Sequence, residues 1–148
     1  MKKFTHYRQA DHKDCGPTCL KIIAKYYGKT INIQELRDFS ETTREGSNLL
    51  FLSDAAEKIG FRTLGVKLSV QRIEEAPLPC ILHWNKDHYV VLYKIKKGRY
   101  YISDPAFGLL NYSKEEFVKF WIGNNADDST KEGIALLIEA TPKFFQSD

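Results

Sequence analysis

Residues 9–20 read QADHKDCGPTCL and predict how the fold begins. Asp14 is a suitable helix N-cap, and Pro17 falls in the first turn, where the missing amide hydrogen of proline does no harm. Cys15 is therefore expected at the amino-terminal end of a helix. Apolar residues then recur at helical spacing as far as Gly28, which is expected to end the helix: Leu20, Ile23, Ala24 and Tyr27.

Further helices are predicted on both sides of the middle of the chain. Helical periodicity recurs at 33–39 and again from about Ser47 to Gly60, with a turn at 44–48 between the two segments. A helical turn is expected within 69–76. The segment 113–121 opens with the capping-box pattern S-x-x-E and predicts one more helix.

The second half of the chain is rich in strand-like runs of Val, Ile, Leu, Tyr and Phe. These runs are bounded by Pro, Gly, Asn and Asp, and they lie at 61–68, 79–84, 88–95, 99–103 and 133–140. A loop is expected at 105–110. Helices followed by antiparallel strands predict a single α+β domain over residues 1–148, in which amino-terminal helices pack on an antiparallel sheet.

The composition fits a folded domain and argues against nucleic acid as a partner. The chain is 43% hydrophobic, and its net charge of +3 comes from 22 basic and 19 acidic residues that are interspersed. The chain therefore has no basic stripe that would attract a phosphate backbone. Three cysteines do not resemble the disulfide framework of a secreted domain, and no signal peptide or membrane span is recognisable, so a cytoplasmic location is expected.

The hairpin formed by 88–95 and 99–103 brings two polar residues together. A three-residue loop at 96–98, with glycine in its last position, would pair Val90 with Asp104. His88 would then lie on the same face as Asp104 and diagonal to it, within reach of a hydrogen bond. A two-residue loop would shift the pairing by one residue and place His88 and Asp104 on opposite faces.

A histidine held by a carboxylate is what a general base requires, and such a base acts on a nucleophile. Cys15 is the best candidate, because the positive end of a helix dipole favours the thiolate. The side-chain amide of Gln9, six residues earlier, and the backbone amide of Cys15 could together form an oxyanion hole. These residues predict acyl-transfer chemistry.

The motifs that carry this chemistry resemble a known family. The matching stretches are QADHKDCG at 9–16, KYYGK at 25–29, EKIGF at 57–61, HYVVL at 88–92 and ISDPAFG at 102–108. They are similar to the papain-like cysteine peptidases that cut bacteriocin and peptide-pheromone precursors after a double-glycine leader. The resemblance runs from about Tyr7 to Ala140 and implies a papain-like fold.

Position by position, the resemblance implies that Cys15 is the nucleophile, His88 the general base, Asp104 its orienting residue and Gln9 an oxyanion donor. It implies cleavage after Gly-Gly with no metal or cofactor. The family's domain usually forms the cytosolic amino-terminal part of an ABC transporter. The implied partners are therefore a leader peptide, which docks a helical apolar face on the domain, and the transporter's membrane and nucleotide-binding domains.

The chain departs from the family in length, because it stops at TPKFFQSD and contains no Walker-type glycine loop. An excised peptidase domain is the expected explanation, with a linker starting at about residues 141–148. A free-standing peptidase is the alternative.

The remaining cysteines and histidines allow competing interpretations. Cys19, together with His6 and His12, could suggest zinc, but the usual ligand spacings are missing and a metal on the neighbouring thiol would occupy the nucleophile. Cys19 and Cys80 are expected to pack in the core. His6 and His12 are expected at the surface.

His83 is the rival for the role of general base, although no carboxylate follows it in a comparable register. Asp14 is expected to cap the first helix, and Asp11 to be solvated. For four large aromatic residues, the sequence leaves open whether they line a cleft or belong to the core: Trp84, Tyr89, Phe107 and Trp121.

Two functions of other classes remain possible alongside the peptidase. One is a non-catalytic domain that only binds a leader peptide for a transporter. The other is a different acyl-transfer enzyme on a papain-like scaffold, such as an amidase or a transferase.

Overall fold

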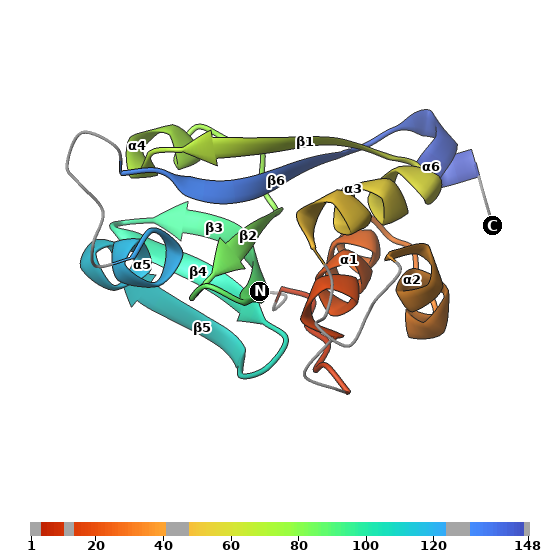
Figure 1. The fold of residues 1–148 in the computed structure, drawn as a ribbon, viewed down its shortest axis with the longest axis horizontal. Coiled ribbons are helices and arrows are strands. Elements are labelled where there is room, and N and C mark those ends of the chain that lie inside the picture. The colour runs from red at the N-terminus through yellow and green to blue at the C-terminus, as the bar shows by residue number, and fades with distance from the viewer. Residues whose placement is uncertain (1–3, 11–13, 41–47, 124–130, 147–148) are drawn as a thin grey trace.

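The computed structural model describes residues 4–10, 14–40, 48–123 and 131–146, which form an α+β fold (Figure 1). Its helices are α1 (Cys15–Tyr26), α2 (Ile33–Ser40), α3 (Leu49–Lys58), α4 (Val70–Ile73), α5 (Lys114–Trp121) and α6 (Pro142–Gln146). Its strands are β1 (Phe61–Leu68), β2 (Cys80–Trp84), β3 (His88–Lys96), β4 (Arg99–Asp104), β5 (Gly108–Ser113) and β6 (Gly133–Ala140).

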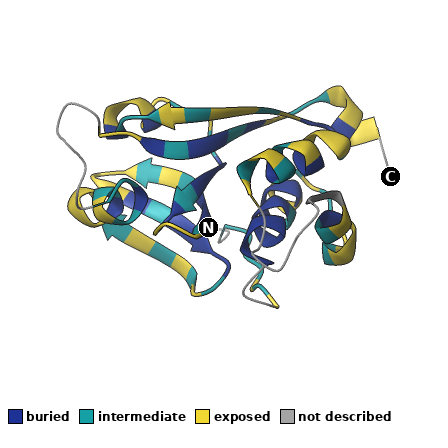
Figure 2. Cartoon of the chain, viewed as in Figure 1, coloured by how far each residue is buried: buried dark blue, intermediate teal, exposed yellow. Residues whose placement is uncertain are grey.

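The strands form one antiparallel sheet in the order β1-β6-β2-β3-β4-β5. One hydrophobic core lies between α1–α3 and the sheet, and a second lies between the sheet and α4 and α5. Helix α1 is buried along most of its length (Figure 2). The predicted arrangement of amino-terminal helices on an antiparallel sheet is confirmed.

The predicted helices and strands are present, and the structure adds two elements that the sequence did not predict, β5 and α6. Strand β5 occupies part of the segment expected to be a loop at 105–110. It is an edge strand with no fully buried residue, so the apolar signal of a buried strand is absent from its sequence. The turn predicted at 44–48 falls almost entirely outside the described residues, and Asn48 caps α3 by accepting from the amide of Phe51.

The β3–β4 hairpin reaches the predicted register by a different route. Lys96 pairs with Arg99, so the loop has two residues, but the register shifts between Leu92 and Lys94. This bulge adds one residue to β3, and beyond it Leu92 pairs with Ile102. The prediction of a three-residue loop was wrong, whereas the pairing expected at the far end of the hairpin is correct.

Residues 142–146, which the sequence suggested as the start of a linker, form α6. The side chain of Phe144 is fully buried and stacks on Phe61, with ring centroids 4.5 Å apart. Gly60 allows this close approach, because a Cβ atom there would lie 2.4 Å from the backbone of Phe144. The chain therefore packs against its core up to α6, and the extent of a single domain over 1–148 stays a prediction.

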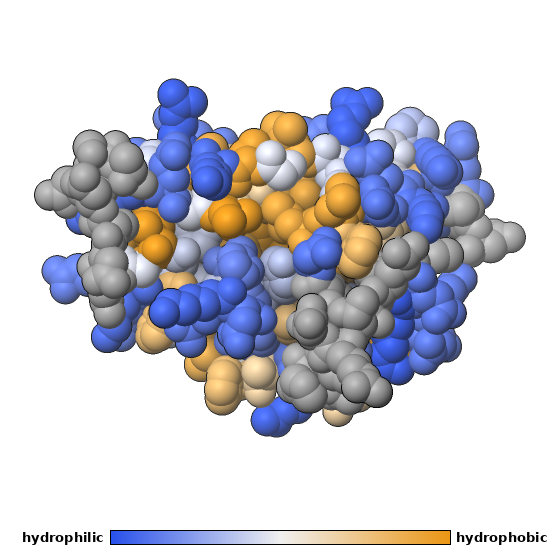
Figure 3. Space-filling model, viewed as in Figure 1, coloured by the Kyte–Doolittle hydropathy of each residue, from blue (hydrophilic) through white to orange (hydrophobic). Residues whose placement is uncertain are grey.

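Apolar side chains gather on the surface over β1, β6 and the start of α3 (Figure 3). Leu64 on β1 is 59% exposed and pairs across the strands with Leu137 on β6. A cavity of about 340 Å³ lies here, lined by Arg62, Thr63, Leu64, Pro77, Leu137 and Glu139. We call the apolar residues of this lining, Leu64, Pro77 and Leu137, the apolar surface. Within the described part of the chain, no helix is long and apolar enough to cross a membrane.

Candidate active site

Cys15 is the first residue of α1, as predicted. Only 5% of it is exposed, and it belongs to the core between α1–α3 and the sheet. The amide groups of a first helical turn have no partners within the helix, so this end of α1 presents donors and a positive partial charge to the sulfur. Such surroundings favour a thiolate.

His88 and Asp104 meet on the face of the sheet that the hairpin register predicted. His88 is the first residue of β3, Asp104 is the last of β4, and Nε2 of His88 lies 2.7 Å from Oδ1 of Asp104. The same carboxylate oxygen accepts a hydrogen bond from the amide of Ala106 at 2.9 Å. Asp104 is 2% exposed, so the turn after β4 fixes a carboxylate that in turn orients the imidazole.

His88 also interacts with Cys15, which joins residues from three elements in one cluster. Burial alone would lower the pKa of His88. Hydrogen bonds to Asp104 and Cys15, together with the charges of both groups, outweigh burial and raise the pKa to about 9. The imidazole therefore keeps its proton at neutral pH. A protonated imidazole between a thiol and a carboxylate can stabilise a thiolate and can later donate its proton.

Gln9 lies in the amino-terminal segment that runs beside the end of β4. Its backbone amide donates to the carbonyl oxygen of Pro105 at 2.9 Å, one residue after Asp104. Arg8 makes a similar contact, from Nη2 to the carbonyl oxygen of Ala106 at 3.4 Å. The structure thus places Gln9 beside the turn that follows Asp104, at one side of the cluster of Cys15, His88 and Asp104.

His6 was expected at the surface, and this expectation was wrong. It is half-buried, and its Nδ1 lies 2.8 Å from Oγ of Ser103, which is fully buried. This contact fastens the segment before Gln9 to β4. The two residues are 97 positions apart, and no local pattern in the sequence links them. His12 and Asp11 lie outside the described residues.

Asp14 takes the N-cap position of α1 but does not cap the helix with its side chain, so this prediction was also wrong. Asp14 is 3% exposed, and its carboxylate binds Arg37 of α2 instead. The backbone of Asp14 is not extended as that of a capping residue usually is, and a charged partner from another helix holds its carboxylate. Nothing in the local sequence marks Arg37 as that partner.

Cys19 and Cys80 are fully buried, as expected for packing residues. Burial raises the pKa of Cys19 well above its ordinary value and that of Cys80 to about 12, so both are held as thiols. All three cysteines are free. Among the residues that the structure describes, no group of three or more His, Cys, Asp or Glu side chains is placed to hold a metal ion.

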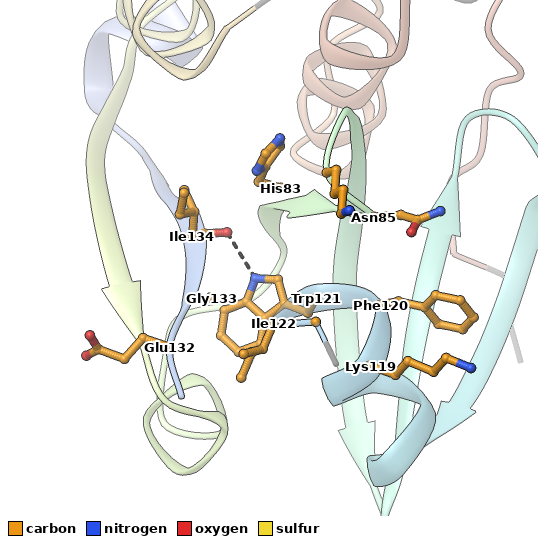
Figure 4. Close-up of a pocket in the computed structure, with 11 residues that line it drawn as sticks. His83, Asn85, Lys119, Phe120, Trp121, Ile122, Glu132, Gly133 and Ile134 are labelled. Carbon is orange, nitrogen blue, oxygen red and sulfur yellow. Dashed lines mark hydrogen bonds between the residues drawn. The ribbon is translucent and has the colours of Figure 1, made fainter. Parts of the chain in front are cut away.

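His83, the rival base, lies beside a cavity of about 460 Å³ between the β2–β3 turn, the end of α5 and the start of β6 (Figure 4). Its ring centroid is 5.2 Å from that of Tyr89, and burial is the main cause that lowers its pKa. In the same cavity the indole Nε1 of Trp121 donates to the carbonyl oxygen of Ile134. Of the two candidate bases, His88 is the one whose imidazole makes a hydrogen bond to a carboxylate within the described residues, that of Asp104.

The aromatic residues left open by the sequence divide into two groups. Trp84, Tyr89 and Trp121 are at most 7% exposed and belong to the cores. Phe107 is 75% exposed in the turn that follows Asp104. Only Phe107 among these four residues presents its ring to solvent.

Comparison with known proteins places this arrangement among related chains. The sequence profile of the peptidase C39 family matches residues 3–126. The chain is 39% identical over 129 residues to the lactococcin-G-processing and transport ATP-binding protein LagD of Lactococcus lactis, covering 83% of this chain and 18% of the relative. It is 34% identical over 115 residues to the colicin V secretion/processing protein CvaB of Escherichia coli, covering 78% of this chain and 16% of the relative.

Solved structures agree with the sequence comparison. A double-glycine-motif protease of an AMS/PCAT transporter, in complex with its leader peptide, superimposes with a TM-score of 0.83 and 30% identity, covering 94% of this chain and 93% of that one. The peptidase domain of Streptococcus ComA gives a TM-score of 0.81 at 29% identity, covering 94% of this chain and 100% of that one. The chain spans less than a fifth of the length of the curated relatives LagD and CvaB.

Proposed function

Because this chain belongs to the peptidase C39 family, we propose that it is a cysteine peptidase that cleaves the leader of a secreted peptide precursor after a Gly-Gly site. The observation that carries the proposal is the contact of His88 with both Asp104 and Cys15 at the amino-terminal end of α1. Its relatives include processing and transport proteins for bacteriocins. The partners we propose are the leader peptide and the other domains of an ABC exporter, on its cytosolic side.

In the proposed first step, the Cys15 thiolate attacks the carbonyl carbon of the second glycine, and the carbonyl electrons move to oxygen. The backbone amide of Cys15 and the side-chain amide of Gln9 donate to this oxyanion. As the oxyanion collapses, the C–N bond breaks and the His88 imidazolium gives its proton to the departing amine. The leader is then held as a thioester on Cys15.

In the second step, His88, now neutral, takes a proton from a water molecule that attacks the thioester. The tetrahedral intermediate releases the leader with a free carboxylate, and the Cys15 thiolate and His88 imidazolium are restored. Asp104 keeps the imidazole in the orientation that both steps need and does not itself exchange a proton.

The direct test is incubation with a synthetic peptide that carries an amphipathic helical leader ending in Gly-Gly and a short segment after it. Mass spectrometry should find two products that separate after the second glycine. A matched peptide with Gly-Gly replaced by Ala-Ala should be cleaved far more slowly. An intact Gly-Gly peptide after prolonged incubation would contradict the proposed function and would leave leader binding as the remaining alternative.

The pH dependence of cleavage should have an alkaline limb near pH 9. The pKa of His88 is raised to about 9 because the hydrogen bonds to Asp104 and Cys15 outweigh the effect of burial. His88 therefore stays protonated through neutral pH and loses its proton, and the ability to protonate the leaving amine, above about pH 9. A profile of kcat/KM from pH 6 to 10 checks this. An alkaline midpoint close to 6.5 would show an unpaired histidine and overturn the assignment.

We further propose that the leader helix docks on the apolar surface around Leu64. Replacing Leu64 by aspartate should raise KM by about tenfold with kcat little changed, because the contact with one leucine is lost away from the reacting atoms. The matched control is Phe145→Asp on α6, which also replaces an exposed apolar side chain. Equal effects of the two variants on KM would place the docking surface elsewhere.

A further inference from the structure

A partly buried ion pair lies immediately beside the proposed nucleophile. Arg37 holds both carboxylate oxygens of Asp14, with Nε 2.9 Å from Oδ1 and Nη2 2.6 Å from Oδ2. The carboxylate side chain is 4% exposed and the arginine side chain 28%. Leu36, next to Arg37, is fully buried in the core that contains α1. The backbone of α2 is therefore anchored at the point from which the Arg37 side chain extends. A bidentate pair of this kind fixes the direction of the carboxylate.

The first turn of α1 lacks the side-chain cap that α3, α4 and α5 have. Asn48, Ser69 and Ser113 have extended backbones, and each accepts a hydrogen bond from the first turn of its own helix. Asp14 has a φ of −93° and a ψ of 6°, and its side chain makes no such bond. Aspartate is among the strongest N-cap residues where its backbone is extended. At Asp14 the backbone is not extended, and the carboxylate is held by Arg37 and not by the amides of the first turn.

A carboxylate in the capping position would harm the proposed chemistry in two ways. It would accept the amide hydrogens of the first turn, which the thiolate and the oxyanion also need. It would also place a negative charge next to the sulfur, which disfavours the thiolate. Pro17 has no amide hydrogen, so the donors that α1 offers near Cys15 are already few.

We infer that Arg37 is a positioning residue for the reaction: it holds the Asp14 carboxylate away from the first turn of α1 and so keeps the helix end open for the Cys15 thiolate. This inference rests on the proposed peptidase function for its consequence in catalysis. Arg37 acts through Asp14 and touches neither the substrate nor the reacting atoms.

Other titratable groups also surround the sulfur, and they set the background against which Arg37 acts. They are Asp14 at the N-cap of α1, Cys19 on α1, His88 and Tyr89 on β3, and Asp104 on β4. Burial, as the main cause, holds Cys19 and Tyr89 in their neutral forms by raising the pKa of each. Among the described residues, the charges that remain close to Cys15 at neutral pH are therefore those of His88, Asp104 and the Asp14–Arg37 pair.

The test measures the reaction of Cys15 with iodoacetamide as a function of pH, by mass spectrometry of the intact domain and of its peptides. In Arg37→Gln, alkylation of Cys15 at pH 6 should slow by about tenfold and approach the wild-type rate at high pH, because the negative charge of Asp14, now without its partner, disfavours the thiolate. In Arg37→Gln combined with Asp14→Ala, the rate at pH 6 should return to within about threefold of Asp14→Ala alone. Cleavage rates of the Gly-Gly peptide should follow the same order.

Two controls separate this role from a purely structural one. Arg72→Gln removes an exposed arginine on α4 and should leave the profile unchanged. If Arg37→Gln merely loosened the fold, the fully buried Cys19 and Cys80 would be alkylated along with Cys15, and this result would overturn the inference. A double variant no faster than Arg37→Gln alone would overturn it as well. Alkylation does not require cleavage, so a failed peptidase assay leaves this test intact.

Discussion

Replacing Cys15 by alanine is expected to reduce cleavage of a Gly-Gly leader peptide by roughly 10⁴-fold or more, because the attacking thiolate is removed and no other group can form the acyl intermediate. Product formation over hours, quantified by mass spectrometry, checks this. Binding of the leader should survive, because the apolar surface lies outside the cluster of Cys15, His88 and Asp104.

The matched control for this loss is Cys80→Ala, which also removes a fully buried thiol but from the other core. It should retain cleavage. If Cys15→Ala cleaved the peptide at the wild-type rate, the activity would come from another residue or from a contaminating protease. Leader binding without cleavage by the wild-type domain would instead identify a non-catalytic receptor.

Replacing Asp104 by alanine is expected to lower kcat/KM by about 10²- to 10⁴-fold. His88 would lose the hydrogen bond that orients it, and its pKa would fall because that bond and the carboxylate charge both raise it. The alkaline limb of the pH profile should therefore move to lower pH in this variant. A variant that had merely lost stability would not show this shift of the alkaline limb.

The companion variants identify which histidine serves as the base. His88→Ala should also lose cleavage, whereas Asp87→Asn, an exposed carboxylate in the β2–β3 turn beside His83, should retain it. If His83→Ala abolished cleavage and His88→Ala did not, the roles drawn from the hairpin would have to be reversed.

The fold could be predicted largely because its helices and central strands carry strong local patterns. The capping box at Ser113, the glycine stop at Gly28 and the apolar run of β6 all appear where the sequence places them. Strand β5 escaped prediction because an edge strand buries too little to leave an apolar pattern. Phe144 escaped for a different reason, since its burial depends on contact with Phe61 and Gly60 far earlier in the chain.

The hairpin shows why a correct strand pairing can follow from an incorrect local detail. The sequence predicts the loop length poorly, because a bulge can compensate for it. At the bulge, Tyr93 and Lys94 both contact the ring of Tyr101, and this tertiary packing has no local signature. The bulge restores the pairing at the far end of the hairpin, where Leu92 pairs with Ile102, so His88 and Asp104 meet.

The parts of the site that could not be predicted are contacts between elements that are distant in sequence. Arg37 reaches Asp14 only because α2 packs beside α1, and His6 reaches Ser103 only because the amino-terminal segment lies along β4. For both Asp14 and His6, the sequence suggests a role that the residue could fill without a distant partner. Aspartate before a helix suggests a cap, and histidine in a polar segment suggests the surface.

The central claim is that Cys15 attacks the carbonyl carbon of the second glycine of a leader peptide. A leader peptide whose terminal Gly-Gly carries a chloromethyl ketone in place of the scissile amide tests it most directly, because a thiolate at that position displaces chloride and forms a stable thioether. Mass spectrometry of the digested protein should locate one equivalent of peptide on Cys15, and excess substrate should slow the reaction. Attachment to another residue, or an unmodified Cys15 in a domain that still cleaves the substrate, would contradict the account.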